Sequence, residues 1–232
     1  MARSTWLLLA LAACAVVGCM GSRATPEPAK VPTPAEVEAL RKQADTGDEV
    51  DQAKLGELHF KGRGVPQSYA DALKWFRKAA EKNDLDALYR LGEMHERGLG
   101  VAPSLEEAKK YYQRSADRLG SGGLIALSRI YETGRGSPRD PVRAYVCMLL
   151  AEQMTVLSAR MLSSLDPSDR FFEGSTEAIG RKRQELETQL TPAQITEAQR
   201  LAEEWAKKSL SLSARPATSP SPTASSRPSP SR

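Results

Sequence analysis

Residues 53–81 read AKLGELHFKGRGVPQSYADALKWFRKAAE. The same arrangement returns without gaps as YRLGEMHERGLGVAPSLEEAKKYYQRSAD in residues 89–117 and as IALSRIYETGRGSPRDPVRAYVCMLLAEQ in residues 125–153. The three copies begin at residues 53, 89 and 125, so the period is 36 residues. A fixed period of this length is typical of proteins whose repeats stack on one another and bury a shared core.

Each copy predicts two helices joined by a glycine turn. Paired glycines follow the first helix in every copy, at Gly62 and Gly64, Gly98 and Gly100, and Gly134 and Gly136. Glycine can end a helix in the left-handed conformation because it has no Cβ atom to clash. The second helix then begins after a residue suited to an N-cap, and this residue is Ser68, Ser104 or Asp140.

Two glycines lie inside the predicted first helices rather than at their ends. Gly56 and Gly92 occupy the same repeat position, which Ser128 takes in the third copy. A glycine inside a helix costs about 1 kcal/mol relative to alanine. Its recurrence at one position predicts that a neighbouring helix approaches too closely for a larger side chain.

The repeats closely resemble those of the Sel-one-like repeat family, a relative of the tetratricopeptide repeats. The resemblance lies in a leucine and glycine on the first helix, the G-x-G turn, and an aromatic residue and small residues on the second helix. In the first two copies its repeat-structural residues are Leu55, Gly56, Gly62, Gly64, Trp75, Leu91, Gly92, Gly98, Gly100 and Tyr111. The third copy keeps Gly134 and Gly136 but carries Ser128 and Cys147 where the pattern has glycine and an aromatic residue.

The resemblance implies an all-α fold, a right-handed α-solenoid of stacked helix-turn-helix repeats with helical caps. We expect three repeats, at residues 49–84, 85–120 and 121–156. The first cap is a helix within residues 33–48, which Thr33 and Glu36 would open as a capping box.

Residues 157–208 are expected to form the C-terminal capping helices. Asp166-Pro167 and Gly174-Ser175 indicate breaks, followed by a helix from Thr176 to Leu190. A last helix after Thr191 would place Trp205 over the exposed end of the stack.

The first 32 residues predict an export signal and a lipid anchor. An apolar run from Trp6 to Val17 is too short to span a membrane and matches the hydrophobic part of a signal peptide, expected at residues 1–18. The sequence VVGC ending at Cys19 resembles the lipobox of bacterial lipoproteins, which implies lipidation of Cys19 and a tether through residue 32. Cys14 fits the same loose pattern, and ordinary signal cleavage is the remaining alternative. Met20, rather than Asp, follows Cys19, which favours an outer-membrane lipoprotein facing the periplasm.

The charge distribution argues against a nucleic-acid partner. The formal net charge of +4 equals the contribution of Arg3, Arg215, Arg227 and Arg232, which all lie in the terminal segments. Residues 209–232 are rich in Ser, Pro and Arg, and this composition predicts a disordered tail. The tail either contacts a partner or only improves solubility.

Few residues suggest chemistry. His59 and His95 share one repeat position and raise the hypothesis of a metal site, against a simple packing role; packing is the interpretation we prefer. Cys147 stands where Trp75 and Tyr111 stand in the earlier copies, which predicts a buried thiol rather than a nucleophile. Lys61, Arg63, Arg97 and Arg135 near the turns would either bind an acidic partner or keep the turns soluble.

We therefore expect a lipid-anchored helical-repeat scaffold in a bacterial cell envelope, with no catalytic site, cofactor or metal. The family resemblance implies a protein or peptide ligand, and the lipid on Cys19 would supply the contact with the membrane. The alternative is a peptidoglycan-binding or cell-wall-modifying protein. A purely structural outer-membrane component is a third possibility.

Overall fold

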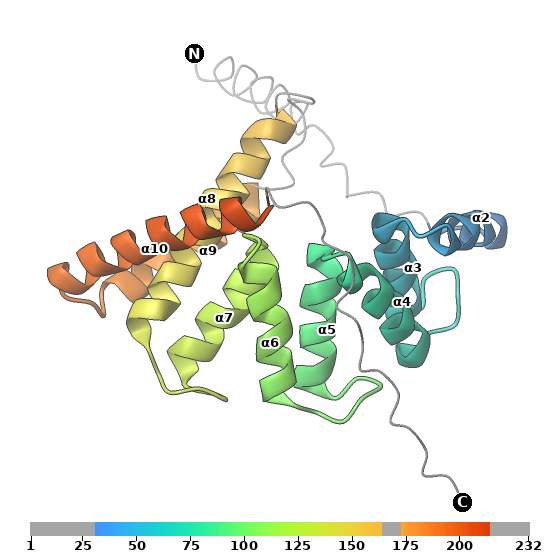
Figure 1. Cartoon of the computed structure of the whole chain (residues 1–232), viewed down its shortest axis with the longest axis horizontal. Coiled ribbons are helices and arrows are strands. Elements are labelled where there is room, and N and C mark those ends of the chain that lie inside the picture. Colours follow the sequence, from blue (N-terminus) through green and yellow to red (C-terminus); the bar gives the residue numbers. More distant parts are fainter. Residues whose placement is uncertain (1–30, 164–172, 214–232) are drawn as a thin grey trace, which may run out of the picture.

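The computed structural model describes residues 31–163 and 173–213, which are helical apart from short connections (Figure 1). No β-strand occurs within these two ranges. The helices are α2 (Pro34–Asp45), α3 (Glu49–Lys61), α4 (Tyr69–Glu81), α5 (Leu85–Arg97), α6 (Leu105–Ala116), α7 (Ser121–Thr133), α8 (Pro141–Ser163), α9 (Glu173–Glu187) and α10 (Pro192–Ser213). The prediction of an all-α fold is confirmed.

The helices form hairpins that stack in chain order. Helices α3 and α4, α5 and α6, and α7 and α8 make the three hairpins, and each corresponds to one copy of the sequence repeat. The second helix of one hairpin also packs against the first helix of the next, α4 against α5 and α6 against α7. Figure 1 shows this succession from α2 through α8. The stack is the predicted α-solenoid.

The turn glycines end the first helix of every hairpin. Gly62, Gly98 and Gly134 have φ angles of 67°, 70° and 71°, and the backbone N–H of each donates to a carbonyl one turn earlier. Residues other than glycine rarely adopt this left-handed backbone conformation. The first helix of each hairpin therefore ends in the same left-handed glycine conformation.

The N-terminal cap covers the open end of the first repeat. Helix α2 begins with the predicted capping box, in which Thr33 and Glu36 bond reciprocally. Its buried residues Val37 and Ala44 pack in one cluster with Leu55 and Trp75. Because a terminal repeat has no neighbour on one side, this helix removes from water an apolar surface that the stack would otherwise expose.

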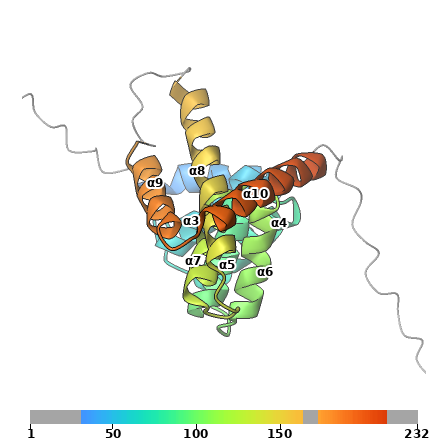
Figure 2. The same ribbon diagram turned by 90° about the vertical axis from the view of Figure 1, so that its left-hand side faces the viewer.

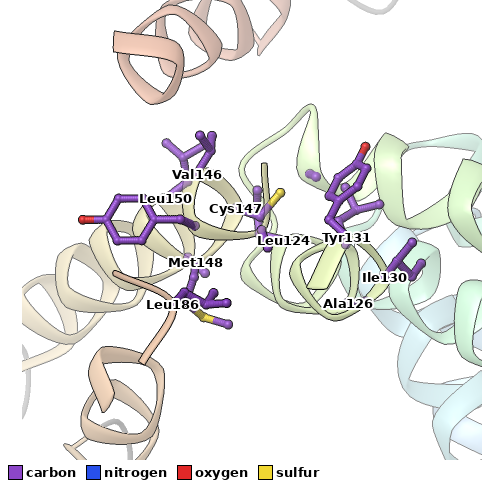
Figure 3. Packing of buried hydrophobic residues seen from close by; sticks show 14 of the residues in the cluster. Leu124, Ala126, Ile130, Tyr131, Val146, Cys147, Met148, Leu150 and Leu186 are labelled. Carbon is purple, nitrogen blue, oxygen red and sulfur yellow. The ribbon is translucent and has the colours of Figure 1, made fainter. Parts of the chain in front are cut away.

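The C-terminal cap departs from the hairpin pattern. Helices α9 and α10 both pack against α8, and they do not pack against each other along their lengths. Figure 2 shows α8 between them. Leu186 of α9 and Ala198 and Ala202 of α10 join the largest core cluster, with Trp205 partly buried at its edge. Figure 3 shows the centre of this core, where α7, α8 and Leu186 of α9 meet.

Two sequence-based boundaries are wrong, and one helix runs past the end of the repeat to which it belongs. Helix α8 runs past residue 156 to Ser163, because no Gly or Pro interrupts residues 142–163. Helix α9 includes the expected break at Gly174-Ser175, since these residues lie in its first turn, where backbone N–H groups need no intrahelical partner. Helix α10 extends to Ser213, so residues 209–213 are not part of a disordered tail. The side chain of Ser209 is buried.

The remaining expectations for the termini concern residues outside the described ranges. These include the signal peptide, Cys14, Cys19 and the tether up to residue 30, as well as Asp166-Pro167 and residues 214–232. Among the described residues, no helix has both the length and the apolar character needed to cross a bilayer.

Candidate functional site

The residues that define the repeat form the core and the turns. Leu55 and Leu91 have no exposed surface, Trp75 is buried against the N-terminal cap, and Tyr111 packs at the edge of the central core. Gly64, Gly100 and Gly136 all have positive φ angles in the turns. Apart from Tyr111, which is partly buried, these positions expose no side chain to a ligand. The candidate site therefore lies elsewhere on the hairpins.

The two helix-interior glycines each lie against an aromatic ring. A Cβ atom at Gly56 would lie 2.7 Å from Cδ1 of Phe76, and one at Gly92 would lie 2.6 Å from Cδ1 of Tyr112. Phe76 lies on α4 and Tyr112 lies on α6, so each ring belongs to the second helix of the hairpin that contains its glycine. The sequence predicted that a neighbouring helix lies close to these glycines, and the group that lies closest is an aromatic ring on the second helix of the hairpin. Ser128 differs because its hydroxyl donates to the backbone oxygen of Ala144 at 2.8 Å.

The two histidines lie in packed surroundings. His59 is buried, and the ring of His95 stacks on Tyr111 with their centroids 5.4 Å apart. Burial lowers the pKa of both imidazoles, and the nearby carboxylates of Asp71 and Glu107 oppose that shift. Within residues 31–163 and 173–213, no three His, Cys, Asp or Glu side chains form a group that could hold a metal ion. The structure gives the metal hypothesis no support.

Cys147 is a buried free thiol on α8, beside Leu124 and Tyr131 of α7 (Figure 3). Burial raises the pKa of this thiol to about 12. Since the thiolate is the nucleophilic form, Cys147 is poorly suited to covalent chemistry at neutral pH. Its position agrees with the expected packing role.

The first helices of the hairpins line a row of three neighbouring hollows. The first hollow lies between α2 and α3, the second between α3 and α5, and the third between α5 and α7. Their volumes are about 590, 570 and 710 Å³. Lys54 and Glu57 line the first and second hollows, and Tyr89 lines the second and third. We call this row of three hollows the groove.

Apolar side chains are exposed along the groove. Five large hydrophobic residues are exposed in the described part of the chain, and Val50, Leu85 and Ile125 among them line the groove. Tyr89 lies at its centre, with its ring 5.8 Å from that of Tyr112. Exposed apolar groups in neighbouring hollows of one surface indicate an interaction surface rather than ordinary surface scatter.

Ion pairs join successive repeats across the same surface. Arg90 of α5 donates to Glu57 of α3 at 2.7 Å and to Glu93 at 2.8 Å. Arg129 of α7 donates to Glu96 of α5 at 2.6 Å. A further pair, Lys182 to Glu132 at 2.7 Å, joins α9 to α7. The pairs of Arg90 with Glu57 and of Arg129 with Glu96 link neighbouring first helices, and all four residues line the groove.

Of the basic turn residues named from the sequence, Arg63 lines the first hollow, and Arg97 and Arg135 line the third. Sequence reasoning missed Arg90 and Arg129, whose acidic partners lie 33 residues earlier in the chain, at Glu57 and Glu96. This separation is one helical turn less than the repeat period. Both pairs have this separation because they join equivalent helices of neighbouring repeats.

Stacked helical hairpins with a groove along their first helices define the protein as an α-solenoid of repeats. The repeats are Sel1 repeats: the family model described as "Sel1 repeat" matches residues 51–84, 85–118 and 121–154. This agreement confirms the resemblance inferred from the leucines and glycines of the period. The matched residues are the three hairpins without the caps.

Two solved structures are similar to this chain. The Sel1 repeat protein from Oxalobacter formigenes is 28% identical, with a TM-score of 0.48, and the match covers 52% of this chain and 50% of that one. A protective antigen of uropathogenic Escherichia coli strains, described as displaying an SLR fold, is 18% identical. Its TM-score is 0.41, and the match covers 83% of this chain and 61% of that one. The chain thus spans half to three fifths of the length of these structures. No curated protein matches it.

Proposed function

We propose that this protein is an exported, lipid-anchored Sel1-repeat scaffold of a bacterial cell envelope that binds a segment of a partner protein in its groove. The observation that carries the proposal is that Val50 and Leu85 in the second hollow and Ile125 in the third are exposed on either side of Tyr89, which lines both hollows. Aromatic residues are enriched in protein-binding surfaces, and the central region of such a surface is more apolar than its rim.

The groove has the form that an extended ligand requires. It runs across four helices from α2 to α7 and is not a single enclosed cavity. Repeat proteins use extended surfaces of this kind for binding. The role in this proposal is non-catalytic, and the groove would hold a partner in place rather than transform it.

The export and anchoring parts of the proposal rest on the sequence. The apolar run that ends at Val16-Val17-Gly18-Cys19 supports a lipoprotein signal, and Met20 favours the outer membrane. The residues up to Pro32 would place the repeats at a distance from the membrane surface.

Crosslinking with mass spectrometry on the membrane-anchored protein tests the proposal. We expect one reproducible protein partner, crosslinked near the groove and lost in a Tyr89→Ala variant. A Leu157→Ala variant is the control, because Leu157 is exposed but lines none of the three hollows. Recovery of glycan strands without a protein partner would support the peptidoglycan alternative instead.

A further inference from the structure

We infer that the third hollow of the groove, between α5 and α7, binds an acidic side chain of the partner segment. This inference rests on the proposed function, since it assigns a chemistry to one part of the same groove. The hollow is lined by Arg97, Arg129 and Arg135 beside the carboxylates of Glu93 and Glu96, with Ile125 and Tyr89 as its apolar part.

The burial of these charged side chains decides whether a ligand in the hollow meets positive or negative charge. The side chains of Glu96 and Glu93 are only 9% and 17% exposed. Those of Arg129, Arg97 and Arg135 are 56%, 59% and 65% exposed. The carboxylates therefore lie at the base of the hollow, and the guanidinium groups form its rim.

The two carboxylates already have donors. Glu93 accepts hydrogen bonds from Arg90 at 2.8 Å and from Arg97 at 2.7 Å. Burial raises the pKa of Glu93, but these two arginines outweigh that effect and hold the pKa below its ordinary value. Glu96 accepts from Arg129 at 2.6 Å and from the hydroxyl of Tyr112 at 2.9 Å. Both acids are thus engaged with the protein and compete weakly for a ligand.

The arginines retain donors toward solvent. A guanidinium group carries five N–H donors in a planar fork, and Arg97 and Arg129 each use one terminal nitrogen in these pairs. Arg135 lies 3.9 Å from Glu96, beyond hydrogen-bond distance. The three arginines outnumber the two carboxylates of the hollow, which leaves a local excess of one positive charge. A carboxylate can accept bidentate bonds from such a fork.

The apolar part of the hollow narrows the ligand class further. Ile125 is exposed beside Arg129, and Tyr89 separates this hollow from the second one, which Val50 and Leu85 line. An extended segment lying across Tyr89 would place apolar side chains in the second hollow and an acidic one in the third. We therefore assign the partner as an acidic peptide segment that also carries aliphatic residues.

Selection from a library of random 12-residue peptides tests this assignment. The library is panned against the full chain and against an Arg129→Gln/Arg135→Gln variant. Peptides enriched on the unmodified chain should contain at least twice the Asp and Glu content of the starting library, and the variant should lose this bias. Arg118→Gln/Arg200→Gln is the matched control, because both arginines are exposed and lie outside the three hollows, and their replacement removes the same two charges.

The affinities of the selected peptides provide the second readout. Fluorescence anisotropy should show Kd rising at least fivefold in Arg135→Gln, a variant that loses no side-chain hydrogen bond and should fold normally. Affinity should also fall as NaCl is raised. Selected peptides without an acidic bias, or a bias that persists in the double variant, would overturn the assignment but leave groove binding intact. No selected peptide at all would count against both proposals.

Discussion

Gly92 on α5 faces the ring of Tyr112 on α6, so that a Cβ atom at position 92 would lie 2.6 Å from Cδ1 of that ring. Gly56 and Phe76 repeat the relationship one hairpin earlier, at 2.7 Å. Tyr112 is almost fully buried and also donates its hydroxyl to Glu96. The glycine thus sets how closely the helices of one hairpin approach, and the ring cannot move without disturbing a carboxylate of the groove.

Gly92→Ala should lower the free energy of unfolding by about 1–3 kcal/mol, because the added methyl group overpacks the contact with Tyr112. Gly180→Ala on α9 is the matched control. Its new Cβ atom would meet only the carboxylate end of Glu152, at 3.0 Å, and alanine is favoured over glycine in a helix by up to about 1 kcal/mol. Urea unfolding followed by circular dichroism should show a lower free energy of unfolding for Gly92→Ala and a higher one for Gly180→Ala. Equal losses at both positions would refute the packing argument.

Arg90→Gln should destabilise the fold by about 1–2 kcal/mol, because it breaks charged hydrogen bonds to Glu57 and Glu93 at a largely buried position. Arg200→Gln is a matched comparison. Arg200 bonds to Glu197 and Glu204, but this cluster on α10 is open to solvent. Exposed pairs contribute little to stability, so the unfolding midpoint should not change measurably. A larger loss for Arg200 than for Arg90 would contradict this reading of the ion pairs.

Stability should fall as the pH drops below 6.5. Burial lowers the pKa of His59 and His95 from the ordinary value of 6.5, so the unfolded chain binds more protons than the folded chain just below that pH. The stabilising effect of the neutral imidazoles is complete above 6.5 and is lost as the pH falls through the folded-state values.

NMR titration of the imidazole signals checks the two shifts directly, since the chain has only two histidines. Asp71 and Arg41 act in opposite directions on His59, as Glu107 and Arg77 do on His95. A His59→Gln/His95→Gln variant should show a flatter dependence of stability on pH between 5 and 7. A measured pKa at or above 6.5 for either imidazole would show that burial does not lower the pKa of that histidine.

Cys147 should resist alkylation in the folded protein. Its thiol is buried and its pKa is raised to about 12, so both access and thiolate formation are limited. The measurement is the labelling rate with iodoacetamide at pH 8, in a chain whose Cys14 and Cys19 are replaced by serine. We expect labelling to become rapid only in denaturant, and fast labelling under native conditions would show that the core around α8 opens.

Cys19→Ser should release the protein from membranes, because lipid on this thiol is the proposed anchor. Cys14→Ser is the control, since Cys14 lies in the apolar run and fits the same short pattern. Partition between detergent and aqueous phases, with the lipid mass measured on the intact protein, separates the two. Release by Cys14→Ser alone would move the anchor to Cys14, and retention of both variants would remove the lipoprotein proposal.

The period predicted the hairpins because the information is local. Gly62 and Ser68 specify a helix end and a helix start within a few residues of each other, and both recur at fixed spacing. The groove could not be predicted in the same way. Whether Arg129 meets Glu96, or Arg135 stays apart from it, depends on how two hairpins are rotated against each other. The C-terminal cap follows no period, and α9 and α10 take their places through core contacts such as that of Leu186.

The arrangement of α9 and α10 on two sides of α8 has a consequence for the length of the molecule. At the junctions α4 to α5 and α6 to α7, each hairpin meets its successor through the same pair of elements, the second helix of one and the first helix of the next. A duplicated 36-residue unit inserted there would find neighbours of the kind it already fits. A unit added after α8 would meet surfaces that α9 and α10 already cover. The protein can therefore be extended by whole modules in its interior, while its C-terminal end is closed to growth.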